Sequence, residues 1–490
     1  MSQFSPILRR LCPVRQHRFA CSLATRRWIP LVWLAALGLA VPSTFGAVAP
    51  RPNILHIHTD DHRADGLGAL GNPVLQTPHL DAVARRGMVF THCYTQGSMI
   101  GAVCLPSRTM LLTGRSWLRI PAGKATAKGE LPMPLPRALG AAGYETFHAG
   151  KSGNEYRPGI EAFDHNLVFD DRTVELRRTS SERHADAAIK FLRERSQTRP
   201  FYIYLAPPVP HDPRVAPDAF LRMYDPHQIP LPAAFLPVHP WDNGEMTVRD
   251  EHLAPWPRTP EDTQRQLAEY YACVSCLDHH AGRIFAAIEE LGQLKNTIIV
   301  FTGDNGLSLG EHGLFGKQNL YEFGGMHVPL VVAGPGVPQG RSDALVYLMD
   351  LFPTFCDWAG ATVPPGVEGR SLAPVVAGRA TKVRDVLYTG YRNCQRAVRD
   401  DRWKLIRYPL VDRTQLFDLQ SDPHELHNLA AQPEHAAKVA ELMALLVQEQ
   451  KRYGDTAPLQ VADPQPAVWM PPRAKPDSPP AKVRAKRKSS

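Results

Sequence analysis

Cys104 stands where the sequence predicts the start of a helix. The residues from Cys104 to Arg108 read CLPSR, and Pro106 suits the first turn of a helix while Gly114 suits its end. The free N–H groups and the dipole of a helix N-terminus favour an anion. Arg108 follows one turn after Cys104 and therefore lies on the same side. A nucleophile beside a guanidinium at such a helix end suits a tetrahedral oxyanion substrate, whereas a lone cysteine there is more often a small buried apolar residue.

Polar residues that could bind a cation or an anion follow four short apolar runs. The runs cover 54–58, 144–148, 201–205 and 297–301, and each is typical of a buried strand. The polar residues after them are, in chain order, Asp60 and Asp61, Lys151, His211, and Asp304 with Asn305. One aspartate after a strand is usually a turn or helix cap. Because ligands of open α/β sheets bind at the carboxyl ends of strands, four such ends together predict one site.

The alternation of short apolar runs with helical patterns predicts an α/β fold with a largely parallel sheet. The chain has 490 residues, of which 43% are hydrophobic and 21% charged. That is enough to bury a large core, and it excludes collagen-like, coiled-coil and wholly disordered chains. We expect one large domain over 50–375 and a smaller one over 376–460.

The chain carries one Cys-x-x-Cys motif, Cys273 to Cys276, inside a helical pattern that runs from 264 to 291. Three-residue spacing places both thiols on one helix face, and no second cysteine pair accompanies them. We therefore expect helix packing rather than redox or metal chemistry.

Taken together, these motifs resemble the type I, formylglycine-dependent sulfatases of the alkaline phosphatase superfamily. The CLPSR stretch is followed by LTGR, Asp60 and Asp61 lie in TDDHR, and Asp304 and Asn305 lie in GDNG followed by GEHG and GK at Lys317. The resemblance covers about 52–450. It implies a large alkaline-phosphatase-like domain, with a mixed, mostly parallel sheet flanked by helices, plus a smaller C-terminal α+β subdomain.

The resemblance also implies roles for individual residues. Cys104 would be converted to Cα-formylglycine, and Arg108 would hold its hydroxyls. One Ca²⁺, or less favourably Mg²⁺, would be held by Asp60, Asp61, Asp304, Asn305 and the modified Cys104, and hard oxygen ligands suit both ions. Lys151 and Lys317 would bind the sulfate, and His211 would protonate the leaving group.

One departure from the family concerns the release of sulfate. The family commonly has Lys-x-His, whose histidine helps to deprotonate the hydroxyl, but here Gly153 occupies that position. We expect another group to replace it. His312 is the first candidate because it follows the metal loop closely, His148 is weaker because it can face the sheet, and Asn154 is a poor base.

The predicted function is that of a sulfuric ester hydrolase acting on a sulfated glycan, or on an aryl or alkyl sulfate. The alternatives are a phosphodiesterase or phosphonate monoester hydrolase of the same superfamily, and a degenerate exported protein that binds sulfated glycans without cleaving them. The required partner is a formylglycine-generating or anaerobic maturation enzyme. Trp241 and Trp256 lie in loops that either wall the pocket or pack between domains.

Both ends of the chain are basic. Residues 1–49 carry six arginines and no acid, and residues 472–490 carry seven basic residues and one acid, so each end has a net charge of +6. Because the whole chain has a formal net charge of +8, residues 50–471 have a net charge of −4. No nucleic-acid partner is therefore expected. Basic residues, an apolar run over 28–41 and AVA at 47–49 are typical of a signal peptide over 1–49, with an uncleaved anchor as the alternative. We expect export to the periplasm or beyond, no membrane span after cleavage, and a disordered basic tail over 461–490.

Overall fold

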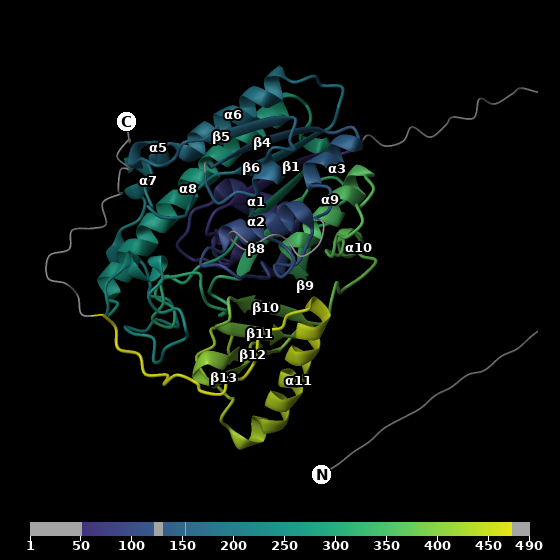
Figure 1. Ribbon diagram of the computed structural model, residues 1–490. Helices are drawn as coiled ribbons and strands as arrows, with labels where there is room; N and C mark the ends of the chain where they lie inside the picture. The colour runs from purple at the N-terminus through teal and green to yellow at the C-terminus, as the bar shows by residue number, and fades with distance from the viewer. Residues whose placement is uncertain (1–50, 122–130, 152, 473–490) are drawn as a thin grey trace, which may run out of the picture. The chain divides into compact units, whose positions relative to one another are not determined.

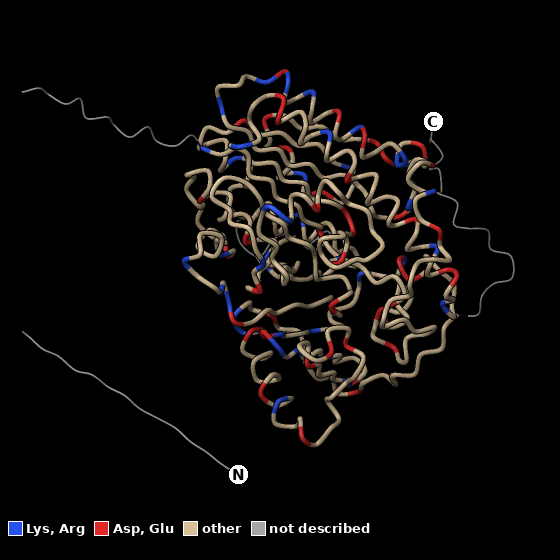
Figure 2. Tube along the Cα trace, turned by 180° about the vertical axis from the view of Figure 1, so that it is seen from behind, with Lys and Arg blue, Asp and Glu red and all other residues tan. Residues whose placement is uncertain are grey.

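The computed structural model describes residues 51–121, 131–151 and 153–472, which lie in one compact unit covering 50–490. The two predicted domains, 50–375 and 376–460, are thus parts of a single unit. The predicted signal peptide, 1–49, lies outside the described residues. Within the described ranges, no helix is both long and apolar enough to cross a membrane. Basic and acidic residues are mixed along the described trace (Figure 2).

The larger sheet has eight strands in the order β5-β4-β6-β1-β7-β8-β2-β9 (Figure 1). The first five strands in this order, β5, β4, β6, β1 and β7, are parallel to one another. Strand β8 is antiparallel to β7 and β2, and β9 is parallel to β2. This mixed, mostly parallel sheet confirms the predicted fold class. The strand bounds are β1 Asn53–Thr59, β2 Met88–Tyr94, β4 Glu145–Lys151, β5 His165–Phe169, β6 Phe201–Ala206, β7 Thr297–Gly303, β8 His327–Ala333 and β9 Gly340–Tyr347.

Helices cover both faces of this sheet (Figure 1). On β1, Leu55 and Ile57 pack toward α1, α6 and α8, whereas Ile54 packs toward α2, α3 and α9. This follows from the alternation of side chains along a strand, which lets a strand buried on both faces be apolar throughout. The helix bounds are α1 Pro78–Arg86, α2 Cys104–Thr113, α3 Leu135–Ala141, α6 Ser180–Glu194, α8 Pro260–Glu290 and α9 Leu351–Ala359. Shorter helices are α4 Arg157–Ile160, α5 Val174–Arg178, α7 Asp218–Leu221 and α10 Ala373–Val376.

Helix α8 buries both thiols of the Cys-x-x-Cys motif. Cys273 and Cys276 are free, and burial raises the pKa of each to about 12. A thiol that stays protonated neither binds a metal nor attacks a disulfide readily, so packing is the role that the structure supports.

A second sheet of five strands has the order β13-β12-β11-β10-β3, and α11 packs on it (Figure 1). Its bounds are β3 Gly97–Ser98, β10 Leu387–Tyr391, β11 Gln395–Arg399, β12 Trp403–Tyr408, β13 Arg413–Asp418 and α11 Ala436–Tyr453. Strand β3 comes from the segment between β2 and α2, so the two sheets are joined by backbone pairing as well as by the chain. A Cβ at Gly97 would meet the Gly390 carbonyl oxygen at 2.1 Å, which explains the glycine at this close approach.

The segment after α11 differs from the predicted tail. The Gln465 amide donates to the Leu410 carbonyl (2.8 Å), the Asp242 amide donates to the Ala467 carbonyl (3.1 Å), and the Trp469 ring lies edge-on to Trp256 with centroids 6.0 Å apart. Ala467 and Trp469 are therefore partly buried against the core, whereas Val468 and Met470 between and after them are exposed. The remainder of the predicted tail, 473–490, lies outside the described residues.

Candidate active site

The carboxyl ends of β1, β4, β6 and β7 meet at one edge of the larger sheet, as the sequence predicts. These four strands are neighbours and parallel. Asp60 and Asp61 follow β1, Lys151 ends β4, and Asp304 follows β7. The segment after β6 returns to β1, since the Asp60 amide donates to the Val209 carbonyl at 3.1 Å. His211, two residues further on, is thereby brought to the same edge.

Helix α2 begins at Cys104 and delivers its thiol to this edge. The Cys104 Sγ lies 3.2 Å from Asp60 Oδ1, 3.6 Å from Asp61 Oδ1 and 3.0 Å from Lys317 Nζ. Burial, reinforced by Asp304, raises the pKa of Cys104 well above its usual value, even though Lys317 opposes the shift. The thiolate is the nucleophilic form of cysteine. The unmodified thiol is therefore held in its inert form, in the midst of charged groups that could bind and polarise a substrate.

A group of ligand atoms suited to one metal ion surrounds Cys104. One atom each from Asp60, Asp61, Cys104 and His211 lies within 4.8 Å of the others. Asn305 Nδ2 donates to Asp61 Oδ1 (2.8 Å), while its buried Oδ1 has no hydrogen-bond partner among the described residues. A buried carbonyl oxygen without a donor is costly unless a cation or water satisfies it, so these residues fit a hard divalent cation.

The Asp304 carboxylate hydrogen-bonds to the backbone of the predicted metal-binding residues. Its Oδ1 accepts from the Asp61 amide (3.0 Å) and the Asn305 amide (2.8 Å), and its Oδ2 accepts from Arg108 Nε (2.9 Å). Asp304 and Asn305 thus lie beside Asp60 and Asp61, but Asp304 is not among the four grouped ligand residues, and its role as a metal ligand stays a prediction.

His211 contributes in a way that the sequence analysis does not foresee. Its Nδ1 donates to the Asp212 carbonyl (2.7 Å), which leaves Nε2 facing Asp61 Oδ2 at 3.8 Å. Burial lowers the pKa of His211 to about 4, so the neutral ring presents a lone pair on Nε2 near pH 7. This arrangement adds His211 to the candidate metal ligands. Its role as a general acid needs a proton on Nε2 and stays a prediction.

Two lysines reach the cluster from opposite parts of the chain. Lys151 Nζ forms an ion pair with Asp60, and Lys317 Nζ forms one with Asp61 at 2.5 Å. Burial lowers the pKa of Lys151 to about 8. Burial alone would also lower the pKa of Lys317, but Asp61 and Cys104 raise it well above its usual value. Two ammonium groups, one at Asp60 and one at Asp61, can neutralise the charge of a bound oxyanion.

Arg108 is completely buried and is held on two of its three nitrogens. Nε donates to Asp304, and Nη1 forms an ion pair with Glu155. Nη2 lies 3.7 Å from Asp60 Oδ2 and has no hydrogen-bond partner among the described residues. Glu155 is absent from the predicted site, because no strand end or motif singles it out.

The histidines expected to replace the missing base lie elsewhere. The His312 ring stacks on Tyr321 with centroids 3.9 Å apart, and His148 Nδ1 bonds to Asn166 Oδ1 (2.7 Å) on the neighbouring strand. No hydrogen bond or ion pair among the described residues joins either histidine to Cys104. Asn154 has a φ of 56° in the turn after β4. The first-choice prediction, His312, is thus not brought to Cys104, because the glycine-rich loop carries its ring away toward the second sheet.

Two family models match the chain. One, described as Sulfatase, matches residues 52–361, and a second, described as N-sulphoglucosamine sulphohydrolase, C-terminal, matches residues 310–452. The chain belongs to the sulfatase family. This confirms the resemblance seen in the motifs and makes the protein a sulfuric ester hydrolase.

Individual proteins similar to this sulfatase cover nearly its whole length. An N-acetylglucosamine-6-O-sulfatase of Bacteroides thetaiotaomicron is 26% identical over 88% of this chain and 91% of its own. A solved structure of a protein in complex with its substrate D-glucosamine-2-N,6-O-disulfate is 25% identical, covers 84% of this chain and 99% of its own, and has a TM-score of 0.71. The phosphonate monoester hydrolase of Agrobacterium radiobacter, at 22% identity, covers 82% of this chain and 96% of its own with a TM-score of 0.70, and it shows the shared fold alone.

The site can do what the sulfatase family requires. The family implies a formylglycine at residue 104 and a divalent metal, which together supply an oxygen nucleophile and a Lewis acid. Around them, Lys151 and Lys317 can bind sulfate oxygens, and Arg108 can donate from Nη2 to an oxygen on residue 104. The burial of all these charges strengthens their action on a bound anion.

Proposed function

We propose that this sulfatase removes sulfate from a sulfated sugar, using a formylglycine made from Cys104 and one bound Ca²⁺. The observation that carries the proposal is the setting of Cys104: its thiol is kept protonated, yet it lies 3.0 Å from Lys317 Nζ and 3.2 Å from Asp60 Oδ1. Such surroundings suit an oxygen nucleophile on residue 104 better than a thiol. A maturation enzyme in the producing cell is therefore a required partner.

A sugar substrate is supported by the similar proteins. One relative is named N-acetylglucosamine-6-O-sulfatase, and the similar structure holds its substrate, D-glucosamine-2-N,6-O-disulfate. Trp241 and Trp256 do not decide the matter, because both are buried in packing contacts, Trp241 against Tyr408 and Trp256 against Trp469.

Calcium is proposed on the chemistry of the ligands. The oxygens come from Asp60, Asp61 and Asn305, and Ca²⁺ takes six to eight such ligands in flexible geometry. Mg²⁺ demands near-ideal octahedral geometry and stays the second choice.

The test uses the protein co-expressed with a formylglycine-generating enzyme. Mass spectrometry of the peptide containing residue 104 should show conversion of the cysteine, and sulfate should be released from members of a library of sulfated sugars. Matched phosphate and phosphonate esters serve as the comparison. Faster cleavage of those esters than of any sulfate ester would favour the phosphonate hydrolase alternative.

Export is proposed from the sequence of residues 1–49. Fractionation of the producing cells, with N-terminal sequencing of the mature protein, should find the enzyme outside the cytoplasm with its first residue near position 50. A full-length chain in the cytoplasm would contradict this.

A further inference from the structure

The orientation of Arg108 depends on Glu155. A guanidinium is planar, so two anchored nitrogens fix the direction in which the third one points. Asp304 holds Nε and Glu155 holds Nη1, and the third nitrogen, Nη2, is left on the side of Asp60. Asp60 Oδ1 is in turn 3.2 Å from Cys104 Sγ. The unpaired nitrogen of Arg108 therefore lies beside Asp60, the carboxylate that also contacts Cys104.

Among the described residues, Glu155 forms its one ion pair with Arg108. It lies in the turn between β4 and α4, its side chain is 3% exposed, and its Oε2 has no hydrogen-bond partner among the described residues. The groups whose charges act on it are Arg108 from α2, Lys151 from β4 and Asp304 after β7. Tyr204 of β6 is a further neighbour of Arg108 and Glu155, and its buried hydroxyl has no hydrogen-bond partner among the described residues.

Glu155 also differs from the other carboxylates around Arg108. Asp60 belongs to the candidate metal ligands, and Asp304 braces their loop. Among the described residues, Glu155 has no hydrogen bond or ion pair with that group, unlike the other two carboxylates. Its ion pair with Arg108 therefore serves the arginine and not the metal.

Because position 153 has no histidine, the orientation of Arg108 matters more for catalysis. Where the family has Lys-x-His, two side chains, the arginine and the histidine, can hold the hydroxyls on residue 104. Here Gly153 supplies none, so Arg108 must hold them without that partner. Any loss of its alignment then acts directly on turnover.

We propose that Glu155 is a positioning residue that acts through Arg108, whose alignment matters more because position 153 offers no histidine. The inference rests on the proposed function of residue 104. By fixing Nη1, Glu155 keeps Nη2 aimed at the oxygen carried by residue 104 during transfer and release of sulfate.

The test compares the matured wild type with E155Q, which keeps the shape of the side chain and removes its charge. We expect kcat to fall about ten- to hundred-fold, the range for residues that orient a catalytic group, while KM changes little. In the double variant E155Q/G153H, kcat should recover in part, because the new imidazole gives the hydroxyls a second partner. A Cβ at Gly153 meets no atom within 4 Å, so the backbone leaves room for a side chain to begin there.

E161Q is the matched control, because the side chain of Glu161 is 62% exposed and pairs with Arg157 on the surface. It should match the wild type. An E155Q enzyme with wild-type kcat, or a loss of kcat that G153H does not relieve, would overturn the proposal, since a merely structural role predicts no recovery. If E155Q does not fold, E155D is tested in its place. We expect its kcat to be lowered, and an unchanged kcat would contradict the proposal. A matured wild type that cleaves no sulfate ester would instead refute the proposed function.

Discussion

In the proposed function, residue 104 supplies an oxygen nucleophile, which agrees with surroundings that keep its thiol protonated. Burial and Asp304 hold the pKa of Cys104 far above neutral pH. A serine would supply a hydroxyl that could accept sulfate, but it lacks the second hydroxyl needed to expel it. We therefore expect C104S and C104A to give no turnover in a host that does not oxidise serine, with the melting temperature unchanged.

The check for this prediction is sulfate release by purified variants beside the matured wild type. More than trace turnover by C104A would refute the mechanism. Sulfate retained on residue 104 of C104S, seen by mass spectrometry, would support the account of release.

A second prediction at the residue scale concerns the oxygen atoms that would bind the metal. Asp60, Asp61 and Asn305 gather polar atoms that a bound cation would satisfy, and a ligand that binds only the folded state stabilises it by mass action. Chelation should lower sulfatase activity and the melting temperature together, and added Ca²⁺ should restore both. Complete removal of metal, confirmed by elemental analysis, with no change in either quantity would identify these residues as turn caps.

Much of this site can be predicted from sequence, and the remainder shows where such prediction fails. Asp60, Lys151 and Asp304 are predictable because each follows an apolar run, and parallel strands end at one edge. Glu155 is not, because it lies in a turn and its use depends on the position of Arg108. The prediction for His312 rests only on its place in the sequence, close to the metal loop. That place does not determine the direction in which a glycine-rich loop points the ring.

At the scale of elements, helices α1 and α8 show how a capping partner can come from a distant segment. Helix α1 begins after Thr77, whose side chain does not cap it. Asp278 of α8 accepts instead from the His79 amide (3.2 Å) and the Leu80 amide (2.7 Å). Sequence rules search for caps next to the helix, so they miss this one.

We expect D278A to lower the free energy of unfolding by about 1–2 kcal/mol, because two amide donors lose their acceptor. The measurement is urea unfolding, with kcat expected to stay unchanged because α1 carries no residue of the site. E269A on the same helix is the control, since Glu269 pairs with Arg265 at the surface and contributes only a few tenths of a kcal/mol. Equal stability of D278A and E269A would contradict the capping argument.

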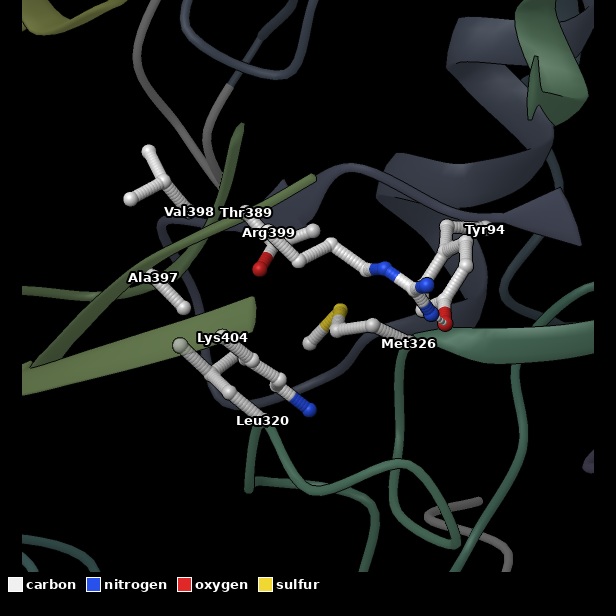
Figure 3. A pocket seen from close by; sticks show the side chains of 8 residues that line it. All are labelled: Tyr94, Leu320, Met326, Thr389, Ala397, Val398, Arg399 and Lys404. Atoms are coloured by element: carbon white, nitrogen blue, oxygen red, sulfur yellow. Dashed lines mark hydrogen bonds between the residues drawn. The ribbon is translucent and has the colours of Figure 1, made fainter. Parts of the chain in front are cut away.

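At the scale of the whole molecule, a buried charge network ties the second sheet to the loop that carries Lys317. Lys404 of β12 donates to Glu322 (2.9 Å) and pairs with Glu425 (2.9 Å), and Arg399 of β11 also donates to Glu322 (3.2 Å). Glu322 follows Lys317 by five residues. Figure 3 shows Lys404 and Arg399 at a small pocket with Tyr94, whose hydroxyl donates to Glu322. The C-terminal sheet thus helps to hold a lysine of the active site.

Replacing Lys404 by methionine keeps most of the unbranched side chain and leaves two buried carboxylates without their shared cation. Removing one partner of a buried ion pair costs about 3–5 kcal/mol, so K404M should lower the free energy of unfolding by that order in urea unfolding. Because the loop that carries Lys317 loses an anchor, KM for the sulfate ester should rise as well. K382M is the matched control: the side chain of Lys382 is 53% exposed, and surface ion pairs such as its pairs with Asp385 and Asp401 contribute about 0–1 kcal/mol. If K404M were destabilised but kept the wild-type KM, the network would stabilise the fold without positioning Lys317.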